Sequence, residues 1–387
     1  MKINAYFCMA KHWVRESLGF VVCGLLMAGA GLAFAQPADA GSPAASGIAA
    51  STAPLVRPRP MARVPRVIGR LHAGDLGLVI NTADPYSVEV GDYYRRVRHI
   101  PDSHVLRIDL PVQPRLAVAD LERLRRRIDE HFDEGVQALA LAWTQPYAVE
   151  CQSITSAVTL GFDAQACDQL CGRRTPSPYF NSASSVPFKD LGLRPSMLLA
   201  SSDVERARGL IDRGVASDHT LGLVGAVPVQ AYFMTTADAT RSVRSALFPP
   251  AGLQRRIGLE NHLDSGDLPR DTSRVVLVQT GVGQFVGAGA IDWVPGALAD
   301  HLTSFGGQLD RTSGQSTVLD WLDAGVTASY GTVSEPCNHL QKFPHPQILL
   351  LHYLQGSTAL EAYWKSVAWP QQGVFVGEPL AAPFARQ

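Results

Sequence analysis

The feature that most constrains this chain is a pair of strand-like segments near its C-terminus, with helical sequence between them. Residues 326–333 are rich in β-branched and small residues. Glu335 and Pro336 follow and end the predicted strand, because proline cannot donate to a sheet ladder. Residues 373–380 repeat that pattern, and residues 347–368 between them predict a helix that breaks near Gly356. We expect a parallel strand–helix–strand unit, whose functional groups gather at the carboxyl ends of the strands.

Strand-like and helix-like segments alternate through the rest of the chain. Predicted strands lie at 76–81, 104–110, 136–143, 196–200, 221–226, 230–234 and 274–280. Predicted helices lie at 87–99, capped by Ser87, and at 118–132, 202–216, 240–248 and 318–324. This alternation predicts an α/β fold with parallel, doubly wound sheets. We expect two joined subdomains, at 66–195 and 196–387, with an irregular excursion at 151–190 in the first.

The N-terminus has the pattern of a secretory signal over residues 1–35. A basic start precedes an apolar run at 18–32, and Ala33-Phe34-Ala35 forms a cleavage pattern before Gln36. An uncleaved anchor is the alternative, but the apolar run is short for a membrane span. We expect cleavage and an exported protein, periplasmic or extracellular, with no transmembrane segment after cleavage.

Residues 36–65 are rich in Ala, Pro, Ser and Gly and have no apolar period. Such a segment cannot bury enough surface to offset its chain entropy, so we expect a disordered linker.

Composition excludes several classes of function. The formal net charge is −1 and basic residues are scattered along the chain, so we expect neither nucleic-acid binding nor a lipid-binding stripe. No G-x-G-x-x-G follows the first predicted strand, which argues against a dinucleotide. We expect no cofactor, and the sequence identifies no partner.

Four cysteines remain once Cys8 and Cys23 leave with the signal: Cys151, Cys167, Cys171 and Cys337. An even number in an exported protein predicts disulfides, and the absence of paired C-x-x-C motifs argues against a zinc or other metal site. We expect a local Cys167–Cys171 bond and a long-range Cys151–Cys337 bond.

Several short motifs carry a resemblance to an uncharacterised family of exported bacterial proteins. They are Asn81 with Asp84-Pro85 and Ser87, Tyr93-Tyr94, Arg98, Ile100-Pro101, and residues 152–157, 178–181, 299–307, 329–337, 342–344, 362–366 and 377–380. The match spans nearly the whole mature chain. That family has no assigned activity.

More distantly, the layout is similar to gingipain-type cysteine peptidases of the caspase-like group. The resemblance implies two α/β subdomains and a catalytic His-Gly and Cys at the ends of neighbouring strands. Here Thr280-Gly281 stands where the His-Gly is expected, and the nucleophile position falls near Ser304. The resemblance therefore implies a degenerate, non-peptidase member of that fold.

Three sets of residues are candidates for catalysis. Cys337 can act as a nucleophile with His301 or His339 as its base, or it is half of a disulfide. Asp300, His301 and Ser304 suggest an acid, a base and a hydroxyl, with His301 and Ser304 on one face if residues 293–304 are helical. Glu335 and Glu378 form a possible carboxylate pair.

Binding candidates are the polar and glycine positions that follow two predicted strands. They are Asn81, Asp84, Thr280, Gly281 and Gly283. We expect His301 and Glu335 to share one cleft at the carboxyl edge of the sheet. Two functions stay open: a catalytically silent protein that acts in binding or envelope processes, and a cysteine-peptidase-like hydrolase that uses Cys337.

Overall fold

The structure is a computed structural model that describes residues 61–386. The predicted signal at 1–35 and all but the last five residues of the predicted linker lie outside the described residues. Among the described residues, no helix is long and apolar enough to cross a membrane.

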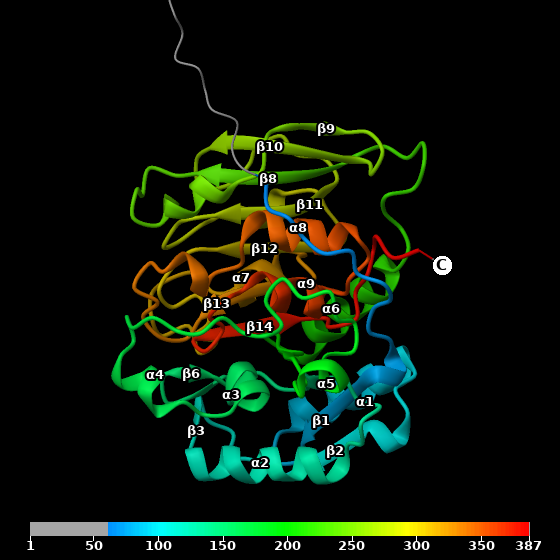
Figure 1. The fold of residues 1–387 in the computed structure, drawn as a ribbon, viewed down its shortest axis with the longest axis vertical. Helices are drawn as coiled ribbons and strands as arrows, with labels where there is room; N and C mark the ends of the chain where they lie inside the picture. Colours follow the sequence, from blue (N-terminus) through cyan, green and yellow to red (C-terminus); the bar gives the residue numbers. More distant parts are fainter. Residues whose placement is uncertain (1–60, 387) are drawn as a thin grey trace, which may run out of the picture. The chain divides into compact units, whose positions relative to one another are not determined.

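One large sheet organises the fold (Figure 1). It has eleven strands, in the order β2 (Val105–Ile108), β1 (Leu76–Asn81), β4 (Ala138–Leu141), β7 (Ser196–Leu198), β14 (Gly373–Gly377), β13 (Ala328–Thr332), β12 (Trp293–His301), β11 (Val275–Thr280), β8 (Val229–Thr235), β10 (Leu259–Ser265) and β9 (Gly252–Gln254). A small second sheet contains β3 (Arg115–Leu116), β5 (Ala148–Val149) and β6 (Gln152–Ser153). The prediction of an α/β fold with mostly parallel strands is confirmed.

Helices cover both faces of the large sheet. The main ones are α1 (Pro85–Arg98), α2 (Val118–His131), α3 (Ile154–Leu160), α6 (Val204–Ser217), α7 (Val318–Asp323), α8 (Pro346–Leu354) and α9 (Ala359–Ser366). Apolar residues of α1, α6, α8 and α9 form one buried cluster with the sheet, and those of α2, α3 and α7 form another on the opposite face. The strands between them are buried on both faces, as their continuous apolar runs require.

Strand β14 joins two parallel blocks that run in opposite directions. It is parallel to β7, with Val376 opposite Leu198, and antiparallel to β13, with Tyr330 opposite Phe375. The prediction of a parallel β13–β14 unit is therefore wrong. The chain after β13 returns through α8 and α9 and enters β14 from the end at which β13 finishes, and no local residue pattern encodes that direction.

Other predicted elements are confirmed in outline and corrected in detail. The break near Gly356 separates α8 from α9, and Gly356 has φ +94° there. Asp84 caps α1, because its carboxylate accepts from the amide of Tyr86, whereas the Ser87 hydroxyl accepts from the amide of Asn81. The predicted helix at 240–248 is a 3-10 helix, η3 (Ser242–Leu247).

Two segments have a different conformation from the one predicted. Residues 221–226 form a turn and not a strand, and the turn is exposed from Leu223 onward. Residues 293–301 form strand β12, so His301 and Ser304 do not share a helix face. Both segments are apolar and short, and periodicity alone does not separate strand from helix or turn in such runs.

The excursion at 151–190 packs against the sheet. Its helix α3 is buried along most of its length, and the short helices α4 (Ala164–Asp168) and α5 (Pro187–Leu191) follow it. The large sheet continues across residue 195, since β7 pairs with both β4 and β14. The subdomain boundary at that residue stays a prediction.

A buried charge cluster fixes the end of β14. The Glu378 carboxylate is fully buried and accepts from Arg98 at 2.6 Å and 3.0 Å and from the Tyr94 hydroxyl at 2.6 Å. Arg98 also pairs with Asp218, at the end of α6. These bonds connect α1, α6 and β14, and they satisfy charges that burial would otherwise make very costly.

Replacing Glu378 with Gln is expected to lower the free energy of unfolding by about 3 kcal/mol, because Arg98 then stays buried with one carboxylate fewer. The control is Arg95→Gln on the same helix, since Arg95 pairs with the exposed Asp102. That variant is expected to cost less than about 1 kcal/mol. Urea unfolding followed by circular dichroism measures both, and equal losses would contradict this account of the cluster.

Candidate functional site

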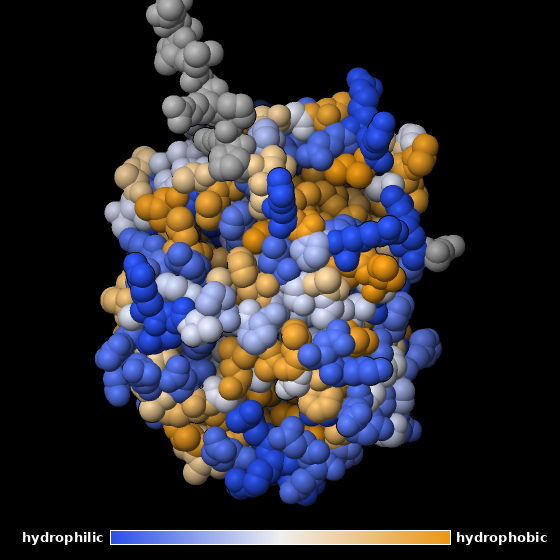
Figure 2. All heavy atoms as spheres, in the orientation of Figure 1, coloured by the Kyte–Doolittle hydropathy of each residue, from blue (hydrophilic) through white to orange (hydrophobic). Residues whose placement is uncertain are grey.

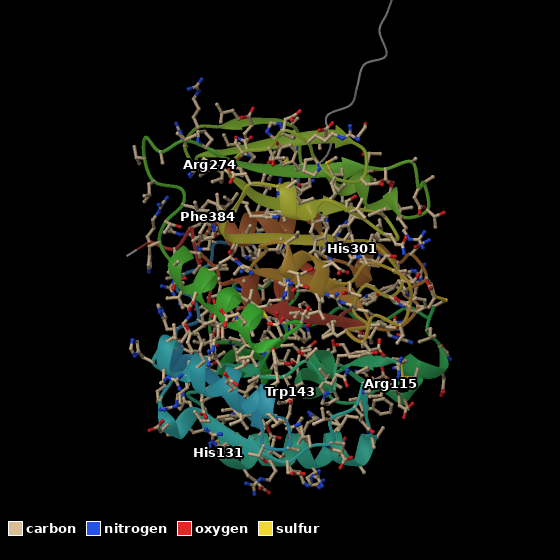
Figure 3. All side chains as sticks on the ribbon, turned by 180° about the vertical axis from the view of Figure 1, so that it is seen from behind. Arg115, His131, Trp143, Arg274, His301 and Phe384 are labelled. Atoms are coloured by element: carbon tan, nitrogen blue, oxygen red, sulfur yellow. A yellow bond between two sulfur atoms is a disulfide. The ribbon has the colours of Figure 1, made fainter. Side chains whose placement is uncertain are left out.

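The candidate site is the carboxyl edge of the block formed by β8, β11, β12 and β13. Strands β11 and β12 are parallel neighbours, and Thr280 lies opposite His301 at their last paired position. The segments that follow these strands, 236–241, 281–287 and 302–317, meet above their ends. His301 lies at the end of its strand within this block (Figure 3). We call this region the carboxyl edge.

A buried ion pair holds the strand ends together. Arg244 of η3 binds the Asp300 carboxylate, and both side chains are at most 2% exposed. The other carboxylate oxygen of Asp300 accepts from the Gln279 amide at 2.9 Å, and Arg244 also donates to the Thr280 carbonyl at 2.9 Å. Burial raises the pKa of Asp300, although Arg244 opposes that shift. With its oxygens bonded in this way, Asp300 stabilises the strand ends and is not presented to a ligand.

His301 is fixed in a neutral form. Its Nε2 donates to the Ser316 carbonyl at 2.9 Å, and its Nδ1 accepts from the Trp321 indole at 2.9 Å. Burial is the main cause that lowers the pKa of His301 to about 4. Since both ring nitrogens are bonded and the ring is 1% exposed, His301 is not placed to act as a general base.

The loop after β12 is held by polar contacts that sequence reasoning missed. The Thr303 hydroxyl accepts from Arg241 at 3.2 Å and donates to the Gln315 side chain at 2.8 Å. Arg241 in turn pairs with Asp238 at 2.6 Å. Ser304 is half-buried, and its carbonyl accepts from Thr332 at 2.9 Å. Because these residues come from separate loops, no spacing pattern could have identified them together.

The two predicted glycines differ in their surroundings. A Cβ on Gly281 would lie 2.0 Å from the Arg241 carbonyl, so the backbone approaches too closely for any side chain. A Cβ on Gly283 would lie 3.7 Å from the Arg241 guanidinium, in ordinary contact. The hydroxyl of Thr280, the last residue of β11, is buried without a hydrogen-bond partner among the described residues.

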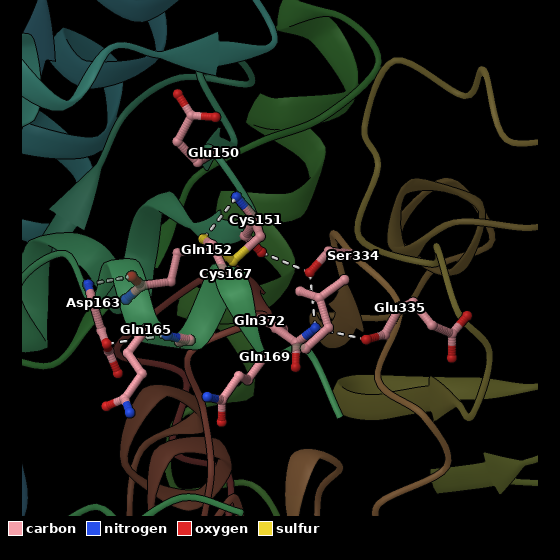
Figure 4. Close-up of a disulfide and its surroundings, with 12 residues drawn as sticks. Glu150, Cys151, Gln152, Asp163, Gln165, Cys167, Gln169, Ser334, Glu335 and Gln372 are labelled. Atoms are coloured by element: carbon pink, nitrogen blue, oxygen red, sulfur yellow. Dashed lines mark hydrogen bonds between the residues drawn. A yellow bond between two sulfur atoms is a disulfide. The ribbon is translucent and has the colours of Figure 1, made fainter. Parts of the chain in front are cut away.

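The four cysteines in residues 61–386 form two disulfides, as predicted, but the predicted pairing is wrong. Cys151 bonds to Cys167 and Cys171 bonds to Cys337, each with Cα atoms 5.4 Å apart. Figure 4 shows Ser334, after β13, beside the first bond, where its hydroxyl donates to the Cys151 carbonyl. The excursion therefore lies against the end of β13 and brings all four cysteines to one place.

Cys337 lies in a loop where both of its candidate bases are occupied elsewhere. Its amide donates to the Glu335 carboxylate at 2.8 Å, and its φ of +56° is followed by +53° at Asn338. His339 contacts the Cys171 carbonyl at 2.9 Å through Nε2, and His301 has the contacts given above. Bonded to Cys171, Cys337 has no free thiol to ionise.

The remaining predicted residues are divided between two strand edges. Glu335 follows β13 and Glu378 follows β14, and these strands are antiparallel, so the predicted carboxylate pair is wrong. Asn81 ends β1 and Asp84 follows it, and this strand runs opposite to β11 and β12. The Asn81 side chain exchanges two hydrogen bonds with the backbone of Leu110, and Asp84 caps α1. Both residues therefore have structural partners away from the carboxyl edge.

Two hollows flank the loop at 304–316. One of about 660 Å³ is lined by Gln284, Phe285, Val286, Arg311, Gln315 and Asp320, among others. The other, of about 410 Å³, is lined by Gln113, Pro114, Arg115, Tyr147, Gln308, Asp310 and Thr312. We call the first the edge pocket. Among residues 61–386, no cluster of three or more His, Cys, Asp or Glu is arranged to hold a metal ion.

No protein-family model matches this chain, and no curated protein matches it. Three solved structures have a backbone fold similar to that of this chain. The Arg-specific cysteine proteinase gingipain R has 11% identity and a TM-score of 0.46, over 82% of this chain and 79% of its own. The complex of the Porphyromonas gingivalis RgpB pro- and mature domains has 10% identity and a TM-score of 0.41, over 80% of each chain.

The third structure is described as a protease. It has 10% identity and a TM-score of 0.39, over 80% of this chain and 78% of its own. The case for any function therefore depends on the residues of this chain.

The acid sensitivity of the protein tests the state of His301. Because its folded pKa of about 4 lies below the value near 6.5 of an unfolded histidine, the unfolded state binds the proton more tightly. The contribution of neutral His301 to the free energy of unfolding is fully present above pH 6.5. It is lost as the pH falls from 6.5 toward 4, and the loss reaches about 3 kcal/mol. His301→Gln, whose amide can keep a bond to Ser316, is expected to flatten that slope.

Urea unfolding at a series of pH values measures this slope, with His131→Gln on the exposed face of α2 as the control. An unchanged slope in His301→Gln would mean that folding does not lower the pKa of His301, and the account of a fixed neutral ring would fail.

Proposed function

We propose that this chain is an exported, non-hydrolytic relative of the gingipain-type peptidases, which binds a ligand at its carboxyl edge. The observation that carries the proposal is the bond between Cys171 and Cys337. A cysteine nucleophile attacks as its thiolate, and a sulfur bonded to another sulfur cannot do so. The two disulfides also suit an oxidising compartment, which supports export.

The positions that carry catalysis in the resembled family support the same conclusion. Thr280 ends β11 and is followed by Gly281, and the residues near Ser304 follow β12. These two strands are parallel neighbours, as that alignment requires. A threonine hydroxyl cannot replace an imidazole as a base at neutral pH. His301 has both ring nitrogens bonded, so Ser304 has no activating partner there. The ends of β11 and β12 therefore lie where the resembled family has its catalytic residues, but they carry neither a general base nor an activated nucleophile.

The edge pocket supports binding. Its volume of about 660 Å³ lies within the usual range for small-ligand sites. Gln284 donates from Nε2 to the Gly314 carbonyl, and the Oε1 of Gln315 accepts from Thr303 and Phe305, so a ligand would meet the other atom of each amide. Phe285 and Val286 offer apolar surface. Val286 is 91% exposed at the rim. A mixture of amide and apolar contacts suits a short peptide, which has alternating backbone polar groups and side chains.

A hydrolase that uses Cys337 is the second candidate. The observation in its favour is that Glu335, Cys337 and His339 occupy one loop after β13. This function requires reduction of the bond to Cys171 before Cys337 can act. The two candidates therefore differ in what a reductant does.

Peptide hydrolysis by the purified protein separates them. We expect no cleavage of casein or of a mixed fluorogenic peptide library, with or without dithiothreitol, because the edge lacks an activated nucleophile. The matched variants are Cys171→Ala, which leaves Cys337 as a free thiol, and Cys337→Ala. Cleavage that appears in Cys171→Ala and is absent in Cys337→Ala would overturn the proposal in favour of the hydrolase.

Retention of peptides tests the binding half of the proposal. Gly289 lines the edge pocket and has open space around it, so Gly289→Trp is expected to fill the pocket without disturbing the fold. Gly74→Trp, which also projects into open space, is the control. Ultrafiltration of a casein digest should show peptides retained by the parent and by Gly74→Trp but lost in Gly289→Trp. Equal retention by all three would contradict binding at the edge pocket.

A further inference from the structure

An apolar turn projects from the opposite edge of the same block. Residues 221–227 connect α6 to β8, and the amide of Ala226 donates to the Leu223 carbonyl at 3.2 Å. Gly222 and Gly225 have φ of +69° and +81°, which the turn requires. The amide of Leu221 donates to the Pro383 carbonyl at 2.9 Å, and Arg386 donates to the Gly222 carbonyl at 2.8 Å. The turn is therefore anchored on the C-terminal segment.

The anchored turn exposes apolar side chains to solvent. Val224 is fully exposed, Val227 is 67% exposed and Leu223 is 51% exposed. Leu253 is 40% exposed and lies on β9, which pairs with β10, and Gly258 in the turn between these strands lies against Gly222. We call these four exposed apolar residues the apolar tip. Holding adjacent apolar side chains out of the core is unfavourable in water, and such clusters commonly mark an interaction surface.

Arginines surround the apolar tip. The β9–β10 turn carries the exposed Arg255 and Arg256, and it reaches the tip because Gly258 lies against the backbone of Gly222. Arg386 bonds to the turn itself, and Arg70 contacts His219 at 3.2 Å just before it. Within residues 219–229, 251–260 and 382–386 the acidic residue is Glu260. Figure 2 shows hydrophobic surface beside strongly hydrophilic surface at this corner, near β9.

We propose that this corner docks on an anionic lipid bilayer. The tip is convex and small, so it suits the boundary between headgroups and acyl chains, where apolar residues gain from burial while arginines stay at the headgroups. The positive ring complements a negative surface, which attracts each nearby arginine. Since the charges come from three separate segments, they form no stripe in the sequence, and the expectation that lipid binding is absent is revised.

Docking at this corner would orient the carboxyl edge. The parallel strands β8, β10 and β11 begin at the corner, and they run away from it toward the candidate site. A protein docked by the apolar tip therefore presents the edge pocket away from the bilayer, open to ligands in the surrounding solution. The inference does not depend on the proposed function, because it uses none of the residues at the carboxyl edge.

Vesicle co-sedimentation tests the proposal directly. The purified protein is mixed with vesicles of phosphatidylcholine alone, or of phosphatidylcholine and phosphatidylglycerol in equal parts. We expect binding to the mixed vesicles that weakens from low to high salt, because salt screens the arginines. Arg255→Glu with Arg256→Glu is expected to reduce the partition coefficient at least about tenfold. Leu223→Ser with Val224→Ser is expected to reduce it by a similar factor.

The controls carry matched changes elsewhere and share the same N-terminus. Arg126→Glu reverses an exposed charge on α2, and Val286→Ser removes an exposed apolar side chain at the edge pocket. Both are expected to bind like the parent. The proposal is overturned if the parent does not bind the mixed vesicles. It is also overturned if the corner variants bind as well as the controls. A corner that captures an acidic protein instead would leave the parent unbound to the mixed vesicles.

Discussion

The structure depends on the two sets of backbone hydrogen bonds that β14 makes, one on each side. With β7 on one side and β13 on the other, the last strand of the chain closes two parallel blocks into one sheet. Because it is antiparallel to β13, the blocks run in opposite directions. The ends of β13 and β14, which the sequence predicted at one edge, therefore lie at opposite edges of the sheet. Glu378 after β14 lies in a buried cluster with Arg98, while Glu335 after β13 lies in the loop that carries Cys337.

The same arrangement decides what the carboxyl edge can do. Its charged and aromatic groups are bonded to one another, with Arg244 on Asp300 and Trp321 on His301. These contacts stabilise the ends of the strands but leave neither residue available to move a proton. Cys337 is bonded to Cys171 in the excursion that packs against the end of β13. What remains accessible is a pocket between loops, and this favours binding over hydrolysis.

Much of the fold could be predicted from local sequence, because apolar period and capping residues report on local structure. The strands at 76–81 and 274–280 and the break at Gly356 follow from such patterns. Long-range relations could not be predicted. The direction of β14 and the partner of Cys337 depend on how distant segments pack, and neither leaves a spacing pattern. The predicted strand at 221–226 is wrong for a related reason. Its apolar residues predict burial, whereas the backbone conformation of Gly222 and Gly225 turns the chain so that Leu223 and Val224 face solvent.

The bond between Cys171 and Cys337 leaves the carboxyl edge without a thiol nucleophile. Non-reduced peptide mapping by mass spectrometry, with free thiols alkylated as the cells are opened, tests it most directly. We expect one crosslinked peptide pair that contains Cys171 and Cys337, another that contains Cys151 and Cys167, and no alkylated Cys337. A Cys337 peptide that carries the alkyl group, or that is joined to a different cysteine, would contradict it.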